Sequence, residues 1–260
     1  MTQSGDARHL LDERLRRVDA LFFVDELAAP RLCDDDLHHL LSVLRPRVGS
    51  VIGLSDGNGS WCTERITALP TRQRRSSMRP SDTAQGLEFA QLDGVVTQTR
   101  EDPELTVAFA MPKGDRMDLI VQKLTEIGID NIVPLITKRT VVRLDEREGT
   151  RRRDRLNKIA REACSQARRL FLPAIHEPQS LEQFLRGAPI GIAFAEPGGS
   201  SLGSEVRGLV VGPEGGWEPD ELSEEFPKVG FGSTVLRVET AAIAAGALLS
   251  AVRANVVQHG

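Results

Sequence analysis

The chain has 260 residues, a formal net charge of −4 at pH 7 and 40% hydrophobic residues, as expected of a globular protein with one or two domains. Its three cysteines lie far apart and its five histidines lack metal-ligand spacing, which argues against a disulfide framework and a metal site. The polar residues after Met1 lead us to expect no signal peptide, and no apolar run is long enough for a bilayer. We therefore expect a cytoplasmic protein with no membrane partner.

The charge is distributed unevenly along the chain. Between Glu64 and Asp82 there are five arginines and no acid, and residues 151–169 carry eight basic residues against two acids. In contrast, residues 196–239 carry nine acids and three basic residues. A net negative charge disfavours nucleic-acid binding, but basic zones of this kind can still bind RNA locally.

The first 97 residues predict a polar extension followed by a small β domain. Residues 1–19 are predicted to be an appended or poorly ordered N-terminus. From residue 20 to 97, short apolar runs at 21–24, 51–54, 61–66 and 87–96 indicate strands. Asp56-Gly57-Asn58-Gly59 is typical of a hairpin turn, and the leucine spacing in 35–44 predicts a helix. We expect a mainly β domain over 20–97, with a barrel as one form of it.

Residues 98–260 change to an alternation of strands and helices. Strands are expected at 105–109, 132–136, 190–195 and 208–211, with a last strand-like run entering Leu236–Val238. Helices are expected at 115–128, 156–170, 218–226 and 239–253. Pro134 favours an edge or an end of its strand. This alternation predicts an α/β domain with a mostly parallel sheet covered on both faces.

Three loops of this domain stand where parallel strands end, the edge at which open α/β sheets bind ligands. They are Ala195–Gly199, Gly212–Gly216 and Leu236–Thr240, and two of them are rich in glycine. Tight turns alone explain a single Gly-Gly pair, whereas three such loops favour a pocket. The phosphate-gripping P-loop, the Gly-x-Gly-x-x-Gly fingerprint and the Gly-x-Ser-x-Gly elbow are all missing from the sequence. The loops therefore predict a ligand held largely by main-chain groups, without naming it.

Several motifs together resemble the ribosomal RNA small subunit methyltransferase E family. The run Val210–Trp217 (VVGPEGGW) matches the family signature, and Leu236–Ala241 (LRVETA) matches a second segment. Further matches are His38–Arg45, Asp56–Gly59, Pro112–Gly128 and Lys138–Val141. The resemblance covers roughly residues 21–253.

The resemblance implies both a fold and an activity. The fold is a PUA-like β-barrel over 20–97 followed by a SPOUT α/β methyltransferase domain over 98–260 with a C-terminal trefoil knot, acting as a homodimer. The activity is S-adenosylmethionine-dependent methylation of N3 of a uridine in 16S rRNA of the 30S ribosomal subunit. On this basis the residues expected to bind the cofactor are Ala195, Glu196, Gly212, Pro213, Glu214, Gly215, Gly216, Leu236 and Arg237.

Three residues are candidates for catalysis, because the uracil imide nitrogen must lose its proton before it attacks a methyl group. Glu239 is a candidate general base, although a carboxylate at a helix start also satisfies backbone N–H groups. Arg169 and Arg237 are candidates for stabilising negative charge on a uracil oxygen, and we favour this arginine route. The family pattern has Glu-Gln where this chain has Ser165-Gln166, so a role for that glutamate does not carry over.

Basic residues in the matched segments and in the 151–169 zone are candidates for RNA contact. They are Arg45, Lys113, Arg139, Arg143, Arg151, Arg152 and Arg153. Two other functions remain open. Another SPOUT activity, such as ribose 2′-O-methylation, would use the same cofactor loop. An RNA-binding or ribosome-assembly module would carry a vestigial pocket, although Gly215, Gly216, Leu236 and Arg237 are all present.

Overall fold

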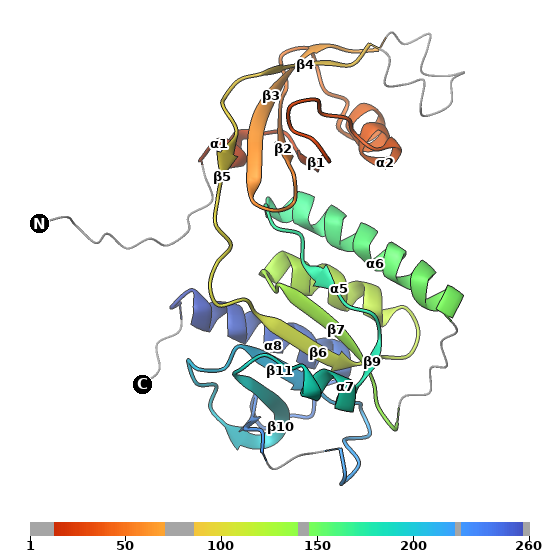
Figure 1. Cartoon of the computed structure of the whole chain (residues 1–260), viewed down its shortest axis with the longest axis vertical. Coiled ribbons are helices and arrows are strands. Elements are labelled where there is room, and N and C mark those ends of the chain that lie inside the picture. Colours follow the sequence, from red (N-terminus) through yellow and green to blue (C-terminus); the bar gives the residue numbers. More distant parts are fainter. Residues whose placement is uncertain (1–12, 71–85, 140–145, 222–224, 257–260) are drawn as a thin grey trace, which may run out of the picture. The chain divides into compact units, whose positions relative to one another are not determined.

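The computed structural model describes residues 13–70, 86–139, 146–221 and 225–256, which form two compact units (Figure 1). The first unit falls within Met1–Arg100 and also takes in Cys164–Phe171, whereas the second comprises Glu101–Ala163 and Leu172–Gly260. The sequence predicted two contiguous domains, 20–97 and 98–260, whereas the structure groups residues 164–171 with the first unit. The physical reason is local, because the Arg168 guanidinium donates to the Val18 and Asp19 carbonyls at 3.1 and 3.2 Å.

The first unit is built on a five-stranded sheet. Its strands run in the order β1-β2-β3-β4, with β5 also paired to β3, and only β1 and β2 are parallel. The elements are α1 (Glu13–Arg17), β1 (Leu21–Phe23), α2 (Asp34–His38), the π-helix η1 (His39–Leu44), β2 (Val51–Ser55), β3 (Ser60–Ala68), β4 (Glu88–Gln91) and β5 (Val96–Thr97). The predicted 35–44 helix is thus confirmed as α2 continued by η1.

Part of the predicted N-terminal extension belongs to this unit. Residues 13–17 are helical, and Leu15 and Val18 are buried. Both side chains reach Gly53 of β2, where a methyl group would lie 3.5 Å from each of them. Of the two alternatives expected for this segment, poor order is therefore wrong for residues 13–19, because Leu15 and Val18 pack against Gly53.

The predicted hairpin is confirmed at the β2–β3 connection. Gly57 and Gly59 have φ values of 76° and 99°, a region that favours glycine. The Asp56 carboxylate closes the turn by accepting from the amides of Asn58 and Ser60 at 2.7 and 3.0 Å. Gly59 also leaves room for Phe171, whose ring would lie 2.5 Å from an added methyl group.

Glu64 is a buried acid on the face of β3 that also carries the core residues Cys62 and Ile66. Burial raises the pKa of its carboxyl, and the Cys62 thiol, 3.8 Å away, opposes this only in part. Because the folded-state pKa lies above the unfolded value, folding favours the protonated acid. The resulting cost is absent below the unfolded pKa and is complete once the pH exceeds the folded pKa.

Replacing Glu64 with glutamine is therefore expected to stabilise the protein at pH 7 but not at pH 4. The gain should be about 1 kcal/mol, or a few degrees in Tm. Thermal unfolding of wild type and Glu64→Gln at both pH values would measure it. Glu88→Gln, an exposed change on the neighbouring β4, is the control with no expected shift. An equal difference at the two pH values would contradict the assignment to the carboxyl.

The second unit contains a seven-stranded sheet in the order β12-β10-β11-β6-β7-β8, with β9 also paired to β7. All of its strand pairs are parallel, which confirms the predicted sheet type. The elements are β6 (Thr106–Ala110), α5 (Arg116–Ile127), β7 (Asn131–Ile136), α6 (Glu146–Ala167), β8 (Ala174–Ile175), β9 (Gln179–Ser180), α7 (Leu181–Arg186), β10 (Ile192–Ser200), β11 (Gly208–Val211), β12 (Lys228–Val229) and α8 (Val238–Arg253).

Both faces of this sheet are buried, as predicted. Along β6, Val107 and Phe109 join the core cluster that contains α5 and α8 residues, whereas Ala108 joins the one that contains α7 residues (Figure 1). Pro134 was expected at an edge or an end, yet it lies within β7. On the side away from β6, β8 pairs with Asn131 and Ile132 and β9 with Leu135 and Ile136, so the proline falls in the gap between them.

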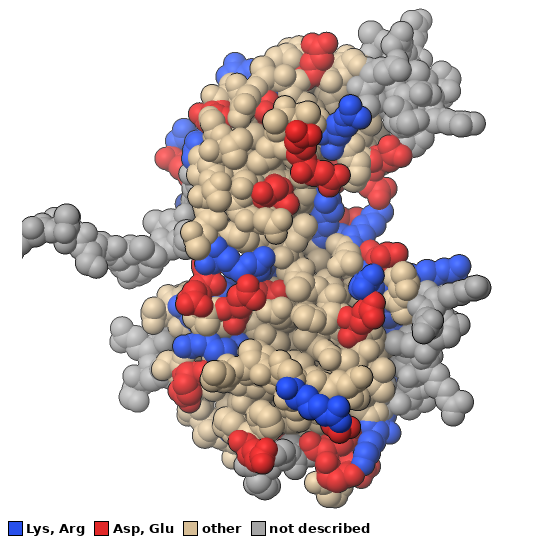
Figure 2. Space-filling model, in the orientation of Figure 1, with Lys and Arg blue, Asp and Glu red and all other residues tan. Residues whose placement is uncertain are grey.

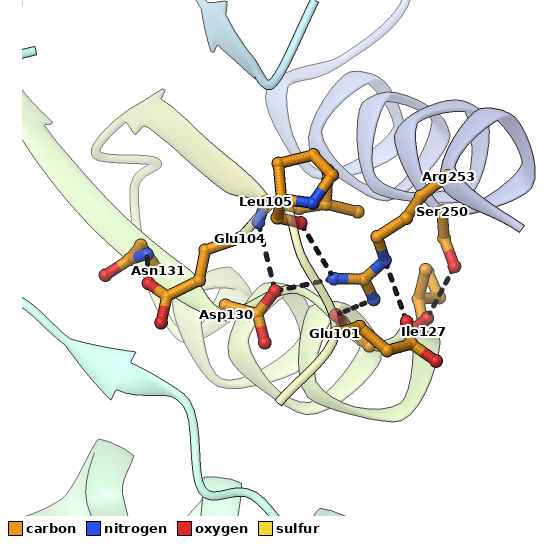
Figure 3. A network of polar contacts seen from close by, with 10 residues as sticks. Glu101, Glu104, Leu105, Ile127, Asp130, Asn131, Ser250 and Arg253 are labelled. Atoms are coloured by element: carbon orange, nitrogen blue, oxygen red, sulfur yellow. Dashed lines mark hydrogen bonds and ion pairs between the residues drawn. The ribbon is translucent and has the colours of Figure 1, made fainter. Parts of the chain in front are cut away.

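Arg253 joins the end of α8 to the segment that enters β6 (Figure 3). Its guanidinium contacts Asp130 Oδ2 at 2.7 Å, Glu101 Oε2 at 2.9 Å and the Gly128 carbonyl at 3.0 Å. Asp130 also accepts from the Leu105 amide at 3.0 Å. The ends of α5 and α8 are thereby tied to the chain that leads into β6.

Candidate functional site

The second unit has a pocket of about 230 Å³ at the carboxyl end of β11, beside the middle of β10 and the start of α8. It is lined by Ala195, Glu196, Pro197, Val211, Gly212, Pro213, Glu214, Gly216, Phe231, Gly232, Thr234, Val235, Leu236 and Ala241. Seven of the nine residues that the sequence assigned to a cofactor are among them; the other two are Gly215 and Arg237. Residues of all three segments therefore line one pocket, although 195–199 belongs to β10 and no strand runs into Leu236.

Each glycine of the Gly212–Gly216 loop is favoured at its position for a different physical reason. A methyl group on Gly212 would lie 2.7 Å from the Trp217 indole nitrogen, and one on Gly215 would lie 3.2 Å from an Arg139 nitrogen. Gly216 has a φ of 74°, and its amide donates to the Pro213 carbonyl at 2.8 Å. Two of these glycines thus admit neighbouring side chains and the third shapes the turn, so close packing on both sides fixes the loop.

The second wall of the pocket comes from β10, which runs past the loop expected at 195–199. After Ala195 the strand changes register against β12, and Ser200 pairs with Val229. Gly199 permits this close approach, because a methyl group there would lie 2.6 Å from the Val229 backbone. Glu196 points its half-buried carboxyl into this region. Burial raises the pKa of that carboxyl, and the Trp217 indole N–H and the Lys228 charge partly oppose the effect.

The third wall is the segment from Phe231 to Leu236, which has no strand where one was expected before α8. Phe231, Gly232, Thr234 and Val235 line the pocket but were not among the site residues expected from the sequence. These residues follow β12, a strand of two residues that no periodicity could reveal. The one sequence feature that could have indicated these residues is their position between Gly230 and the Leu236-Arg237 motif.

The three catalytic candidates lie in different surroundings. Glu239 is in the first turn of α8 and its side chain is 15% exposed, with Oε2 3.5 Å from Arg116 Nη1. Arg237 is the exposed N-cap residue of the same helix, next to the pocket-lining Leu236. Arg169 is half-buried in the first unit, just after the end of α6. The structure thus brings Arg237 and Glu239 to the border of the pocket.

Glu221 organises the segment that follows the Gly212–Gly216 loop. Its carboxylate accepts from the Glu218 amide at 3.0 Å and from the Lys138 amide at 2.8 Å. The helix predicted over 218–226 was wrong for the described residues, because 219–221 and 225 form turns and 226 a bend. A contact with the end of β7, distant in sequence, replaces the local helical hydrogen bonds.

The RNA-contact candidates fall on both units. Arg139 donates to Glu218 at 2.7 Å and Arg153 pairs with Glu177 at 2.6 Å. The others in the described part are Arg45 at the end of η1, Lys113 before α5, and Arg151 and Arg152 in α6; Arg143 lies outside the described residues. On the face shown in Figure 2, basic side chains are interspersed with acidic ones.

Gly212→Ala is expected to disturb the pocket, because Trp217 is buried and packs edge-on against Phe194 with ring centroids 5.4 Å apart. A rigid ring held in this way cannot yield without shifting the loop. We expect a loss of about 1–3 kcal/mol in the free energy of unfolding, measured by urea denaturation. Gly94→Ala is the matched control, since no atom lies within 4 Å of a methyl group there. Equal stability of the two variants would contradict the packing argument.

Two structural findings bear on the kind of site. Among the described residues, no three His, Cys, Asp or Glu side chains are grouped so as to hold a metal ion. Within the same part of the chain, no helix combines the length and apolar character needed to cross a membrane.

Comparisons with known proteins agree with this arrangement. Residues 100–250 match the model of an RNA methyltransferase domain, and residues 32–73 match that of an RNA methyltransferase PUA domain. The protein is thus an RNA methyltransferase by fold and family, with a PUA-like unit before a mixed α/β unit.

Individual relatives narrow the family. The ribosomal RNA small subunit methyltransferase E of Mycobacterium tuberculosis is 30% identical over 89% of this chain and 91% of its own. That of Bacillus subtilis is 27% identical over 87% and 91%. The crystal structure of the Neisseria gonorrhoeae enzyme bound to S-adenosyl methionine matches with a TM-score of 0.72 and 29% identity, covering 89% of this chain and 97% of that one. The chain belongs to the ribosomal RNA small subunit methyltransferase E family.

Proposed function

We propose that this protein transfers a methyl group from S-adenosylmethionine to N3 of a uridine in 16S rRNA. The observation that carries the proposal is the pocket itself. Residues from three segments of the chain, two of which match family motifs, line this pocket beside one parallel sheet. The Neisseria relative was crystallised with S-adenosyl methionine, which supports the same cofactor here.

The lining residues suit this cofactor chemically. Phe231, Val235 and Leu236 offer apolar surface for an adenine ring, and Glu196 and Glu214 offer carboxylates to a ligand that carries a sulfonium and an ammonium charge. The backbone of Gly212 and Gly216 also lines the pocket, so main-chain groups can accept and donate hydrogen bonds. When bound, the cofactor would supply an electrophilic methyl group.

The residues of the chain then have two tasks. The first is to hold the uracil in line with the methyl group, and near-attack placement of this kind contributes several kcal/mol, up to about 7–11 in ideal cases. The second is to favour loss of the N3 proton. We propose that Arg169 or Arg237 does this by stabilising negative charge on a uracil oxygen. Glu239 is the less favoured candidate, because its carboxylate is already engaged by Arg116.

The finer fold and the partners belong to the same proposal. We expect the first unit to close as a β-barrel and the second to contain a trefoil knot formed by the three loops. The protein should act as a homodimer on the 30S subunit in the cytoplasm. The residues proposed to contact rRNA phosphates are Arg45, Lys113, Arg139, Arg143, Arg151, Arg152 and Arg153.

Labelled methyl transfer to 30S subunits or 16S rRNA that lack the modification tests the proposal. Nucleoside mass spectrometry should identify N3-methyluridine as the product. A 2′-O-methylated nucleoside would instead indicate another SPOUT activity. Absence of both transfer and S-adenosylmethionine binding in calorimetry would indicate an RNA-binding module with a vestigial pocket.

A further inference from the structure

Arg116, which the sequence did not single out, is the residue at which three elements of the site meet. It is the first residue of α5. Its Nη1 lies 3.4 Å from Glu214 Oε1 in the loop after β11 and 3.5 Å from Glu239 Oε2 in the first turn of α8. One guanidinium thus contacts carboxylates from two walls of the pocket.

The charges explain why this contact matters. Glu214 and Glu239 would repel each other without a cation between them. The Glu239 side chain is only 15% exposed, and among the described residues its Oε2 has no hydrogen-bond partner. A carboxylate with so little access to water needs a compensating charge, and Arg116 is the cation paired with it.

Both carboxylates lie at the pocket, so their pairing with Arg116 affects how the pocket is shaped. Glu214 itself lines the pocket, and Glu239 lies between the lining residues Leu236 and Ala241. The Gly212–Gly216 loop, which contains Glu214, is also contacted by the side chains of Trp217 and Arg139. The start of α8 has no side-chain cap hydrogen bond. The Arg116–Glu239 ion pair is therefore a side-chain contact that holds the start of this helix.

We infer that Arg116 is a positioning residue, which holds the Gly212–Gly216 loop and the start of α8 at the spacing that the cofactor requires. It does so through Glu214 and Glu239 rather than by touching the reacting atoms. This inference rests on the proposed binding of S-adenosylmethionine to this pocket. Its consequence is that loss of Arg116 weakens cofactor binding while the chemical step at saturating cofactor is retained.

The test compares wild type with Arg116→Met, which keeps the aliphatic bulk, and with Arg116→Lys, which keeps the charge but not the fork. Arg155→Met is the matched control. Arg155 of α6 also forms an ion pair with α5, through Asp118, but neither residue lines the pocket. Isothermal calorimetry with S-adenosylmethionine gives Kd, methyl-transfer kinetics give KM and kcat, and amide hydrogen exchange of the cofactor-free protein reports on both walls.

For Arg116→Met we expect about a tenfold weaker Kd and higher KM for S-adenosylmethionine, with kcat unchanged. The amides of 212–216 and 238–241 should exchange faster than in wild type and in Arg155→Met. Arg116→Lys should fall between them. Glu214→Gln, which keeps the Arg116–Glu239 pair, should accelerate exchange only in 212–216.

Wild-type exchange rates and Kd in Arg116→Met would overturn the inference. A kcat that falls with an unchanged KM would also overturn it, by assigning Arg116 to the chemical step. Failure of the wild-type protein to bind S-adenosylmethionine would instead overturn the proposed function, and the exchange comparison would still decide whether Arg116 holds the two walls.

Discussion

Arg253→Met is expected to lower the free energy of unfolding of the second unit by about 3–5 kcal/mol, the usual cost of removing one partner of a buried ion pair. The side chains of Arg253 and Asp130 are 11% and 4% exposed, and their closest nitrogen–oxygen distance is 2.7 Å. Methionine fills part of the same space but leaves the Asp130 carboxylate without its guanidinium (Figure 3). Urea denaturation followed by tryptophan fluorescence would measure the loss.

The control is an arginine of the same unit whose ion pair is solvated. Arg186 pairs with Glu182 one turn earlier in α7, and both side chains are more than two-thirds exposed. Arg186→Met should therefore change stability by less than about 1 kcal/mol. The double variant Arg253→Met/Asp130→Asn should be less destabilised than Arg253→Met alone, because the uncompensated charge is gone. A loss for Arg253→Met as small as that for Arg186→Met would contradict the role of the network.

The sequence predicted the elements whose determinants are local. Helix α5 ends where expected because Gly128 adopts a φ of 104° and caps it, and its buried face follows the 3.6-residue period. The β2–β3 hairpin likewise follows from two glycines and an aspartate within one turn. The three pocket loops were found for a similar reason, because each follows a recognisable strand or precedes a recognisable helix.

The features that the sequence missed depend on distant partners. The segment 218–226 has helical spacing, yet Glu221 bonds to the Lys138 amide and holds the backbone in turns. Arg139 was singled out as an RNA-contact candidate, but nothing in the sequence connected it to Gly215 and Glu218, which it contacts in the structure. Nothing in the sequence connected Arg116 to Glu214 and Glu239, because these residues are distant in the sequence and come together only when the second unit folds.

The prediction that bears most directly on chemistry concerns Arg169. Its backbone amide bonds to the Cys164 carbonyl at 2.9 Å, just beyond the end of α6. Burial raises the pKa of the Cys164 thiol to about 11, an effect that the positive charges of Arg169 and Arg100 partly oppose. Arg169 is half-buried, and its positive charge acts on the neighbouring Cys164 thiol.

If Arg169 stabilises charge on the uracil, Arg169→Ala should lower kcat by about 10²–10³, as the loss of one preorganised donor does elsewhere. Binding of RNA at fixed salt should change far less, because a single phosphate contact carries little of the affinity. Arg169→Lys should keep more activity than alanine. Single-turnover methyl transfer at saturating S-adenosylmethionine and RNA measures the chemical step directly.

Arg168 provides a matched control from the same segment. Its guanidinium donates to the carbonyls of Val18, Asp19 and Ser165, so it is committed to the structure of the first unit. Arg168→Met should therefore lower Tm and leave kcat per folded molecule unchanged, the reverse of the pattern expected for Arg169→Ala. An Arg169→Ala variant with wild-type kcat and RNA affinity would exclude Arg169 and leave Arg237 as the arginine to test, since it stands at the start of the helix that borders the pocket.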